Sequence, residues 1–180
     1  MSRCEEILEA SPRITIYHAN QCNPKRCTGL KLERSGLARL VSRTRFLPKR
    51  ALVLNPFAEI AFSPADRQRL ADFGIVALDC SWEHAQKVLS KHVRGTSRCL
   101  PILIAGNPVN FGKATKLTTA EAIAAAFYIA GFKEGAIRIL SVFTWGHTFL
   151  DLNGELLKGY ANTRSSAEIV GVQQTFMSRR

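Results

Sequence analysis

The sequence lacks any apolar run long enough to cross a bilayer, and residues 1–6 do not have the pattern of a signal peptide. It also lacks internal repeats and low-complexity segments, which excludes solenoid and fibrous proteins. The hydrophobic content of 46% is enough to form a core. We therefore expect a globular, cytoplasmic protein that makes no membrane contact.

Two further absences concern disulfides and cofactors. The five cysteines are an odd number at irregular spacing, which argues against a secreted disulfide framework. His18, Cys22 and Cys27 are close in sequence, but their spacing fits none of the usual zinc pairs and no fourth ligand is evident, so we expect no metal site. Neither a GxGxxG nor a Walker sequence is present, so dinucleotide and ATP binding lose support.

Acidic residues are scarce compared with basic ones. The chain has 25 Lys and Arg against 14 Asp and Glu, a net charge of +11. Between residues 25 and 50 only Glu33 opposes the basic side chains. This pattern favours a polyanionic partner, most simply nucleic acid, over a charge that only aids solubility. We expect the RNA-contacting residues to include Lys25, Arg26, Lys31, Arg34, Arg43 and Arg45.

The order of apolar runs predicts an α/β protein. Strands are expected at residues 14–18, 51–54, 75–78 and 100–104, and helices at 30–41, 63–74, 84–91 and 118–130. The chain beyond residue 130 has mainly helical spacing. We therefore predict an N-terminal mixed-sheet domain (residues 1–95) and a mainly helical C-terminal lobe (residues 96–180).

The stretch from residue 98 to residue 126 organises this pattern. It predicts a buried strand, a turn broken by Asn107-Pro108, and a helix that begins at Thr118 with Glu121 completing a capping box. Such a stretch is typical of a cofactor-binding loop, but a packed strand–helix joint would have the same pattern. The residues alone leave both interpretations open.

Three segments share one form, an apolar run followed by a polar or proline-containing turn: residues 52–56, 75–82 and 100–110. Such turns meet at the carboxyl edge of a sheet, where ligands bind. The expected pocket has apolar walls that suit an adenine ring. Asp79 is either a turn cap or a carboxylate at the pocket mouth that can accept a proton. Trp82 is either a core anchor or a wall for a base.

Five motifs are more specific than the general pattern of apolar runs and turns. They are HANQCNPKRCTG (18–29), LNP (54–56), DCSW (79–82), RxLPxLIAxNPVNxGK (98–113) and FxWGxxFLxLN (143–153). In this order they resemble the archaeal and eukaryotic small-subunit ribosomal RNA aminocarboxypropyltransferases. The resemblance covers about residues 14–162.

The resemblance implies a SPOUT-like fold with a deep trefoil knot. It also implies transfer of the 3-amino-3-carboxypropyl group of S-adenosylmethionine to N3 of a pseudouridine, often N1-methylated, in small-subunit rRNA or a pre-ribosomal particle. Matched by motif, the contacts to S-adenosylmethionine fall on Thr28, Leu78, Leu100, Thr115 and Thr119, with Leu54, Pro56 and Trp82 around the adenine. Family members often have an aromatic residue at position 115 and Asp at position 23, where this chain has Thr115 and Asn23.

The uridine-type N3–H must lose its proton, and Asp79 is the candidate base. Two other functions stay open at this point: a SPOUT-class RNA methyltransferase that uses the same donor, and a non-catalytic RNA-binding ribosome-assembly factor. We expect a monomer.

Overall fold

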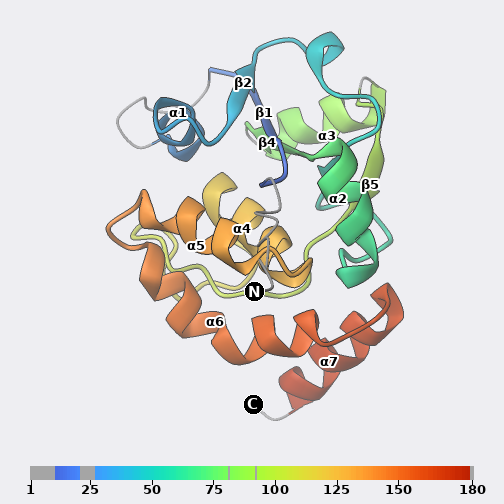
Figure 1. Cartoon of the computed structure of the whole chain (residues 1–180), viewed down its shortest axis with the longest axis vertical. Coiled ribbons are helices and arrows are strands. Elements are labelled where there is room, and N and C mark those ends of the chain that lie inside the picture. Colours follow the sequence, from blue (N-terminus) through green and yellow to red (C-terminus); the bar gives the residue numbers. More distant parts are fainter. Residues whose placement is uncertain (1–10, 21–26, 81, 92, 179–180) are drawn as a thin grey trace, which may run out of the picture.

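A five-stranded parallel sheet lies in the upper half of the molecule as drawn in Figure 1. The computed structural model describes residues 11–20, 27–80, 82–91 and 93–178. The strand order is β2-β1-β4-β3-β5, and every pairing is parallel. The strands are β1 (Ile14–His18), β2 (Arg39–Val41), β3 (Leu52–Leu54), β4 (Ile75–Asp79) and β5 (Thr96–Arg98).

Helices connect and cover these strands. Those within the sheet-forming part are α1 (Thr28–Arg34), η1 (Thr44–Phe46), η2 (Pro64–Asp66), α2 (Arg67–Phe73) and α3 (Trp82–Lys91). The chain then forms α4 (Thr119–Ile129), α5 (Lys133–Ser141), α6 (Gly146–Ala161) and α7 (Ser166–Ser178). Helix α4 lies at the centre and packs on β4, α1, α5 and α6, while α7 packs on α6 (Figure 1).

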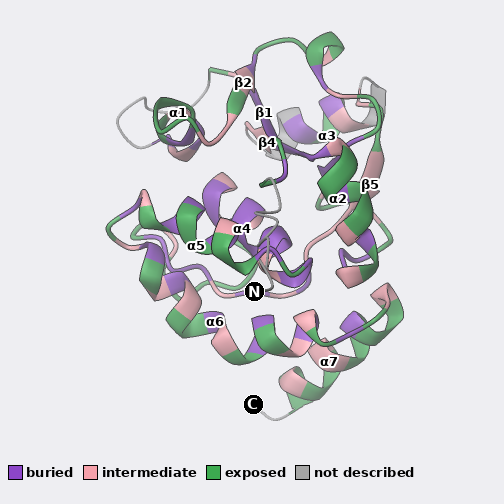
Figure 2. Ribbon diagram, in the orientation of Figure 1, coloured by how far each residue is buried: buried purple, intermediate pink, exposed green. Residues whose placement is uncertain are grey.

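Both faces of the sheet are buried, as a parallel sheet requires (Figure 2). In β1, Ile14 and Ile16 belong to the core that contains α4, whereas Tyr17 belongs to a smaller core with Val88 of α3. Strands β3 and β4 alternate in the same way. The two-residue period of the strands therefore divides the apolar side chains between two layers of helix.

The predicted fold class is corrected in three respects. The sheet is all-parallel and not mixed. The expected helix over residues 30–41 is a short helix followed by the edge strand β2, and the other edge strand, β5, lies before residue 100, where no strand was predicted. Over the described residues the structure does not show the expected SPOUT-like arrangement with a deep trefoil knot, and we withdraw that assignment.

The segment predicted as a strand at residues 100–104 is extended but does not join the sheet. Side chains of α6 and α7 bind its backbone instead. The Asn153 amide accepts the Ile104 N–H (2.7 Å) and donates to the Ile104 carbonyl (2.7 Å). Tyr160 donates to the Ile102 carbonyl, and Gln173 accepts the Ile102 N–H. These contacts take the place of a neighbouring strand.

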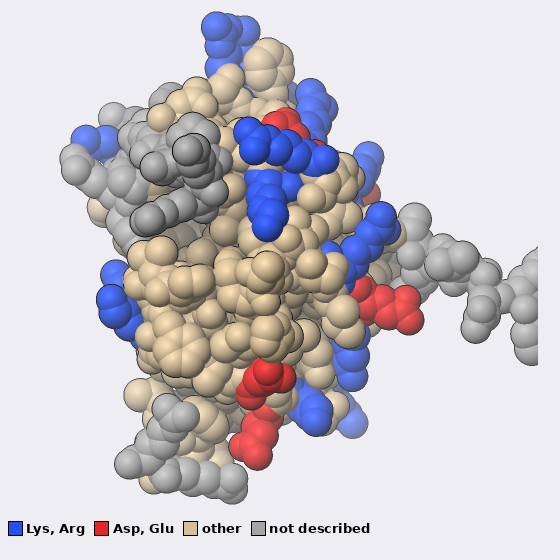
Figure 3. All heavy atoms as spheres, turned by 90° about the vertical axis from the view of Figure 1, so that its left-hand side faces the viewer, with Lys and Arg blue, Asp and Glu red and all other residues tan. Residues whose placement is uncertain are grey.

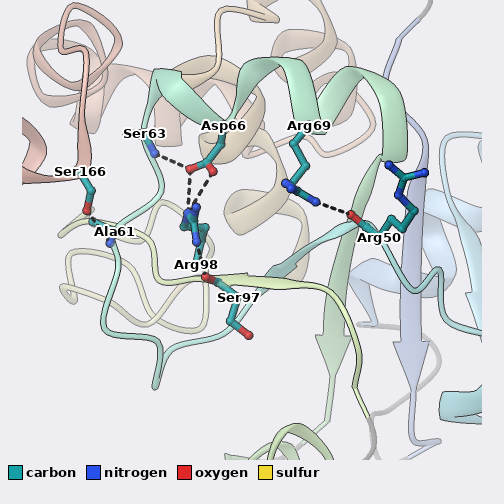
Figure 4. Close-up of polar contacts among 8 residues, drawn as sticks. All are labelled: Arg50, Ala61, Ser63, Asp66, Arg69, Ser97, Arg98 and Ser166. Carbon is teal, nitrogen blue, oxygen red and sulfur yellow. Dashed lines mark hydrogen bonds and ion pairs between the residues drawn. The ribbon is translucent and has the colours of Figure 1, made fainter.

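An ion pair fixes the turn between β3 and α2 against β5. The buried Asp66 carboxylate accepts both the Ser63 N–H and the Nε–H of Arg98, the latter at 3.0 and 3.1 Å (Figure 4). The Ser166 hydroxyl at the start of α7 accepts the Ala61 N–H in the same region. The predicted helix start at Ser63 and stop at Gly74 are confirmed, with η2 as its first turn.

The predicted division near residue 95 stays a prediction. Strand β5 follows that position and pairs with β3, and the larger core joins side chains from β1 through α7. Among the described helices none is long and apolar enough to span a bilayer.

Asn153→Ala tests the role of the amide. The variant removes three hydrogen bonds, to the N–H and carbonyl of Ile104 and to the Phe149 carbonyl, at a fully buried site. We expect a loss of about 2–4 kcal/mol in the free energy of unfolding, because buried backbone groups lose their partners. Urea denaturation measures the loss. Asn162→Ala, at an exposed position at the end of the same helix, is the control; equal stability of the two variants would contradict the assignment.

Candidate functional site

A cavity of about 610 Å³ opens at the carboxyl ends of β3 and β4. Its walls also include the start of α1, the inner side of α3, residues 99–101, the loop before α4 and the first turns of α4. It is large enough for a nucleoside with an attached amino acid. The carboxyl edge of a parallel sheet is where ligands bind in open α/β folds, so this cavity is the candidate site.

The structure brings the predicted site residues together in this cavity. Asp79 lies there with seven of the eight predicted donor-binding residues: Thr28, Leu54, Pro56, Leu78, Leu100, Thr115 and Thr119. Trp82 is the first residue of α3, and its side chain lies outside the described residues. The contacts of these residues with a ligand stay a prediction.

A second cavity, of about 650 Å³, lies between α6 and α7. Its lining runs from Glu155 to Phe176 and includes no residue of the five sequence motifs. All of its lining residues belong to α6, α7 and the turn between them, whereas the candidate residues meet at the carboxyl ends of the strands. We therefore assign the function to the cavity at the sheet edge.

Asp79 is held by two neighbours at the mouth of this cavity. The register of β1 and β4 pairs His18 with Asp79. The Cys27 thiol donates to Asp79 Oδ2 at 2.9 Å, and Cys27 Sγ lies 3.3 Å from His18 Nε2. On the other side of the ring, His18 Nδ1 is 2.8 Å from Asn20 Oδ1. These contacts fix the carboxylate in one orientation.

The close approach of α1 to β4 needs a glycine. A Cβ on Gly29 would lie 2.8 Å from Asp79 Oδ2, so a larger residue there would displace the carboxylate. Cys80, the residue that follows β4, is neutral at physiological pH. Burial, and to a smaller extent the Asp79 carboxylate, raises the pKa of Cys80 to about 11. Cys80 therefore lines the cavity as a small, mostly unreactive thiol.

His18, Cys27 and Asp79 could also share a metal ion. Their ligand atoms lie within 4.8 Å of one another, which makes them a possible ligand group among the residues that the structure describes. The thiol–carboxylate hydrogen bond explains part of this proximity without an ion. The expected absence of a metal site remains a prediction.

A buried carboxylate holds the loop on the opposite side of the cavity. Glu121 is fully buried, and its Oε1 accepts the N–H groups of Gly106 (2.7 Å) and Asn107 (2.9 Å). Its Oε2 accepts the Asn107 side-chain amide, the Thr118 N–H and the Thr118 hydroxyl. The predicted capping box of Thr118 and Glu121 is thus confirmed, and it also anchors the loop that precedes it.

The described basic residues of the 25–50 stretch are exposed. Lys31, Arg34, Arg43 and Arg45 all face solvent, whereas Lys25 and Arg26 lie outside the described residues. Figure 3 shows Lys and Arg side chains gathered on the upper part of one face, at the height of α1 and β2 in Figure 1. Their contact with RNA stays a prediction.

Comparison with known proteins identifies the family. A family model described as "Ribosome biogenesis protein, C-terminal" matches residues 52–177. The 16S rRNA aminocarboxypropyltransferase of Methanocaldococcus jannaschii is 46% identical over 168 residues, which cover 93% of this chain and 98% of that protein. The protein of the same name from Methanosarcina mazei is 49% identical and covers 90% of this chain and 93% of its own length. The chain belongs to the 16S rRNA aminocarboxypropyltransferase family.

A solved structure agrees with this family. The SAM-dependent rRNA:acp-transferase Tsr3 from Vulcanisaeta distributa is 36% identical, and the two structures align with a TM-score of 0.82. The alignment covers 94% of this chain and 98% of that chain. The five motifs that suggested the aminocarboxypropyltransferases therefore identified the family correctly.

A second family model, "Possible Fer4-like domain in RNase L inhibitor, RLI", matches residues 12–45. Iron–sulfur clusters are usually held by four cysteines, and this stretch contains two, Cys22 and Cys27. The match does not support an iron–sulfur cluster within those residues. Cys27 instead caps α1, since its Sγ accepts the Leu30 N–H.

Sequence reasoning missed several residues of this aminocarboxypropyltransferase site. The sequence suggests only metal binding for Cys27, yet this residue binds Asp79, which is 52 positions later in the chain. Asn55 and Asn110 line the cavity from two of the turns that the sequence predicted at the sheet edge, but neither residue was among the predicted site residues. The position of Cys27 just before a helix is the one local signal of its role.

Glu121→Gln tests the buried anchor. The amide nitrogen would meet N–H donors where the carboxylate accepts five hydrogen bonds, so we expect a loss of about 3 kcal/mol in the free energy of unfolding. Amide hydrogen exchange at Gly106 and Asn107 should also become faster. Urea denaturation and exchange measurements check this. Glu134→Gln, at an exposed position in α5, should leave both unchanged; a Glu121→Gln protein as stable as this control would contradict the role.

Proposed function

We propose that this protein transfers the 3-amino-3-carboxypropyl group of S-adenosylmethionine to small-subunit rRNA, at N3 of a pseudouridine that is often N1-methylated. The observation that carries the proposal is the extent of the match: relatives named for this activity are 46–49% identical to this chain over at least 90% of its length. The gathering of the motif residues in one cavity supports it. We further propose that the protein is monomeric and cytoplasmic and acts in ribosome biogenesis.

The cavity fits the chemistry of the donor. When bound, S-adenosylmethionine supplies a sulfonium with three electrophilic carbons, and the site must present the propyl methylene and not the methyl to the RNA. Leu54, Pro56 and Leu100 give apolar walls for the adenine ring. Thr28 and Thr119 also line the cavity, and we assign their hydroxyls to the amino-acid end of the donor. The Asp79 carboxylate adds a negative charge near a cationic ligand.

Asp79 is the proposed base for the N3–H of the target uridine ring. It lines the cavity, and its side chain is 18% exposed, so a substrate atom can reach it. The hydrogen bond from the Cys27 thiol to Oδ2 restricts the orientation of the carboxylate. A positioned carboxylate of this kind contributes about 100- to 10,000-fold to the rate of proton transfer.

The first experiment identifies the reaction. Purified protein is incubated with S-adenosylmethionine and with 16S rRNA from a strain that lacks this protein. We expect methylthioadenosine as the released product and a mass increase of the aminocarboxypropyl group on one nucleotide. Release of adenosylhomocysteine would show methyl transfer instead, and binding of RNA with no heat of S-adenosylmethionine binding would indicate an assembly factor.

Asp79→Asn tests the base. Asn has the same shape as Asp and can still accept a hydrogen bond from the Cys27 thiol, so we expect the affinity for S-adenosylmethionine to stay nearly unchanged. Because an amide cannot act as a base, kcat should fall by about 100- to 10,000-fold. Single-turnover kinetics and calorimetry measure the two quantities. Asp151→Asn, at an exposed position on α6, is the matched control. Near-normal turnover of the Asp79 variant would exclude the assignment.

We also propose that the exposed basic residues bind rRNA phosphates. Replacing Arg43 and Arg45 by Ala should weaken RNA binding, and the slope of log K against log salt should become shallower by about 0.7–0.9 for each phosphate that is no longer neutralised, because fewer counterions are released. Fluorescence anisotropy at several salt concentrations measures the slope. Arg138→Ala, also exposed but on α5, should keep the original slope. An unchanged slope in the double variant would remove these two residues from the interface.

A further inference from the structure

Two large apolar side chains stand in solvent beside the cavity. Val109 and Phe111 are 69% and 60% exposed, the highest values among the large hydrophobic residues that the structure describes. Between them lies Asn110, which lines the cavity. An exposed aromatic side chain gives no hydrophobic stabilisation to the folded chain, so its position at the cavity rim suggests a role in binding.

Hydrogen bonds hold this loop in its exposed position. Asn107, itself bound by Glu121, accepts the Asn110 N–H through its side chain (3.0 Å). Two backbone bonds then close the turn, Gly112 N–H to the Ala105 carbonyl (2.9 Å) and Ala105 N–H to the Lys113 carbonyl (3.0 Å). Folding the tip back to bury Phe111 would break these bonds, and the base of the loop is fixed at Asn107 by a fully buried carboxylate.

The same loop has the charge and the strain of a binding site. Lys113 and Lys116 are exposed, and no acidic residue occurs in the sequence from Gly106 to Ala120. Thr115, which lines the cavity, has a φ of 61°, a conformation that a β-branched residue rarely adopts. Strain of this kind concentrates at functional sites. An exposed aromatic residue followed by two cations suits a nucleic acid better than an apolar protein surface.

We propose that Phe111, with Val109 beside it, forms a stacking surface for an unpaired rRNA base next to the target nucleotide, and that Lys113 and Lys116 bind the adjoining phosphates. This inference rests on the proposed function, because it places the RNA loop over the cavity. Stacking on an aromatic side chain is tolerant of base identity and contributes about 1–3 kcal/mol per base. The loop would thus position the RNA, while the cavity residues carry out the transfer.

The test uses the full chain with 16S rRNA from the deletion strain and saturating S-adenosylmethionine. We expect Phe111→Ala to raise the KM for RNA by about 5- to 150-fold, which corresponds to the stacking of one base. Affinity for S-adenosylmethionine should not change. Phe111→Trp should keep the wild-type KM because tryptophan can also stack on a base, and the fluorescence of the new tryptophan should be quenched when RNA binds. Ile137→Ala, 52% exposed on α5, is the control for loss of an exposed apolar side chain.

The outcomes separate this inference from the proposed function. An unchanged KM in Phe111→Ala would overturn the stacking surface even if transfer is observed. If the wild type transfers nothing, the proposed function fails, and anisotropy with the same RNA still compares Phe111→Ala with the wild type; equal affinities would then overturn the inference as well. Loss of self-association in Phe111→Ala, with RNA binding intact, would show an interface between copies of this chain and would also overturn it.

Discussion

The Glu121 carboxylate connects the first turn of α4 to the loop that borders the cavity. A buried charge is tolerated only when its hydrogen bonds are complete, and here five donors surround it. The carboxylate therefore fixes three things together: the start of α4, the turn at Asn107 and the side of the cavity that contains Thr115 and Thr119. Removing this charge would loosen all three.

The opposite side of the cavity depends on the parallel sheet. Parallel pairing places the ends of β1 and β4 next to each other, so that His18 and Asp79 become neighbours. Helix α1 can then approach because Gly29 has no side chain, and Cys27 reaches Asp79 from its cap position. The donor site is thus formed between a rigid sheet edge and an anchored loop. Such preorganisation favours one orientation of a flexible donor.

Local signals predicted much of the fold. The caps at Ser63, Gly74 and Thr118 were readable because capping depends on residues only three or four positions apart. The edge strands β2 and β5 were missed because each has only three residues, because β5 has no apolar side chain, and because an edge strand is defined by its neighbour. Residues 100–104 have the apolar pattern of a strand. That pattern cannot show that side chains of α6 and α7, and not a neighbouring strand, bind the backbone of this segment.

The convergence of the site was predictable in outline, because turns after parallel strands meet at one edge. The predicted knot came from the family resemblance, and the predicted mixed sheet came from an ambiguous order of apolar runs. The strand pairings show a parallel sheet, and the described residues do not show the knot. The Cys27–Asp79 hydrogen bond could not be predicted, because the two residues are distant in the sequence. The second role of Glu121 could not be predicted either, because its bond to the Gly106 N–H exists only in the folded chain.

The segment that borders the cavity at Leu100 depends on α6 and α7, two helices that follow it in the chain. Its backbone is bound by Asn153 and Tyr160 of α6 and by Gln173 of α7. On the ribosome, the sheet strands emerge before α6 and α7, so residues 102–104 gain these side-chain partners only after both helices have left the exit tunnel. This wall of the donor site is therefore completed after the sheet that it borders.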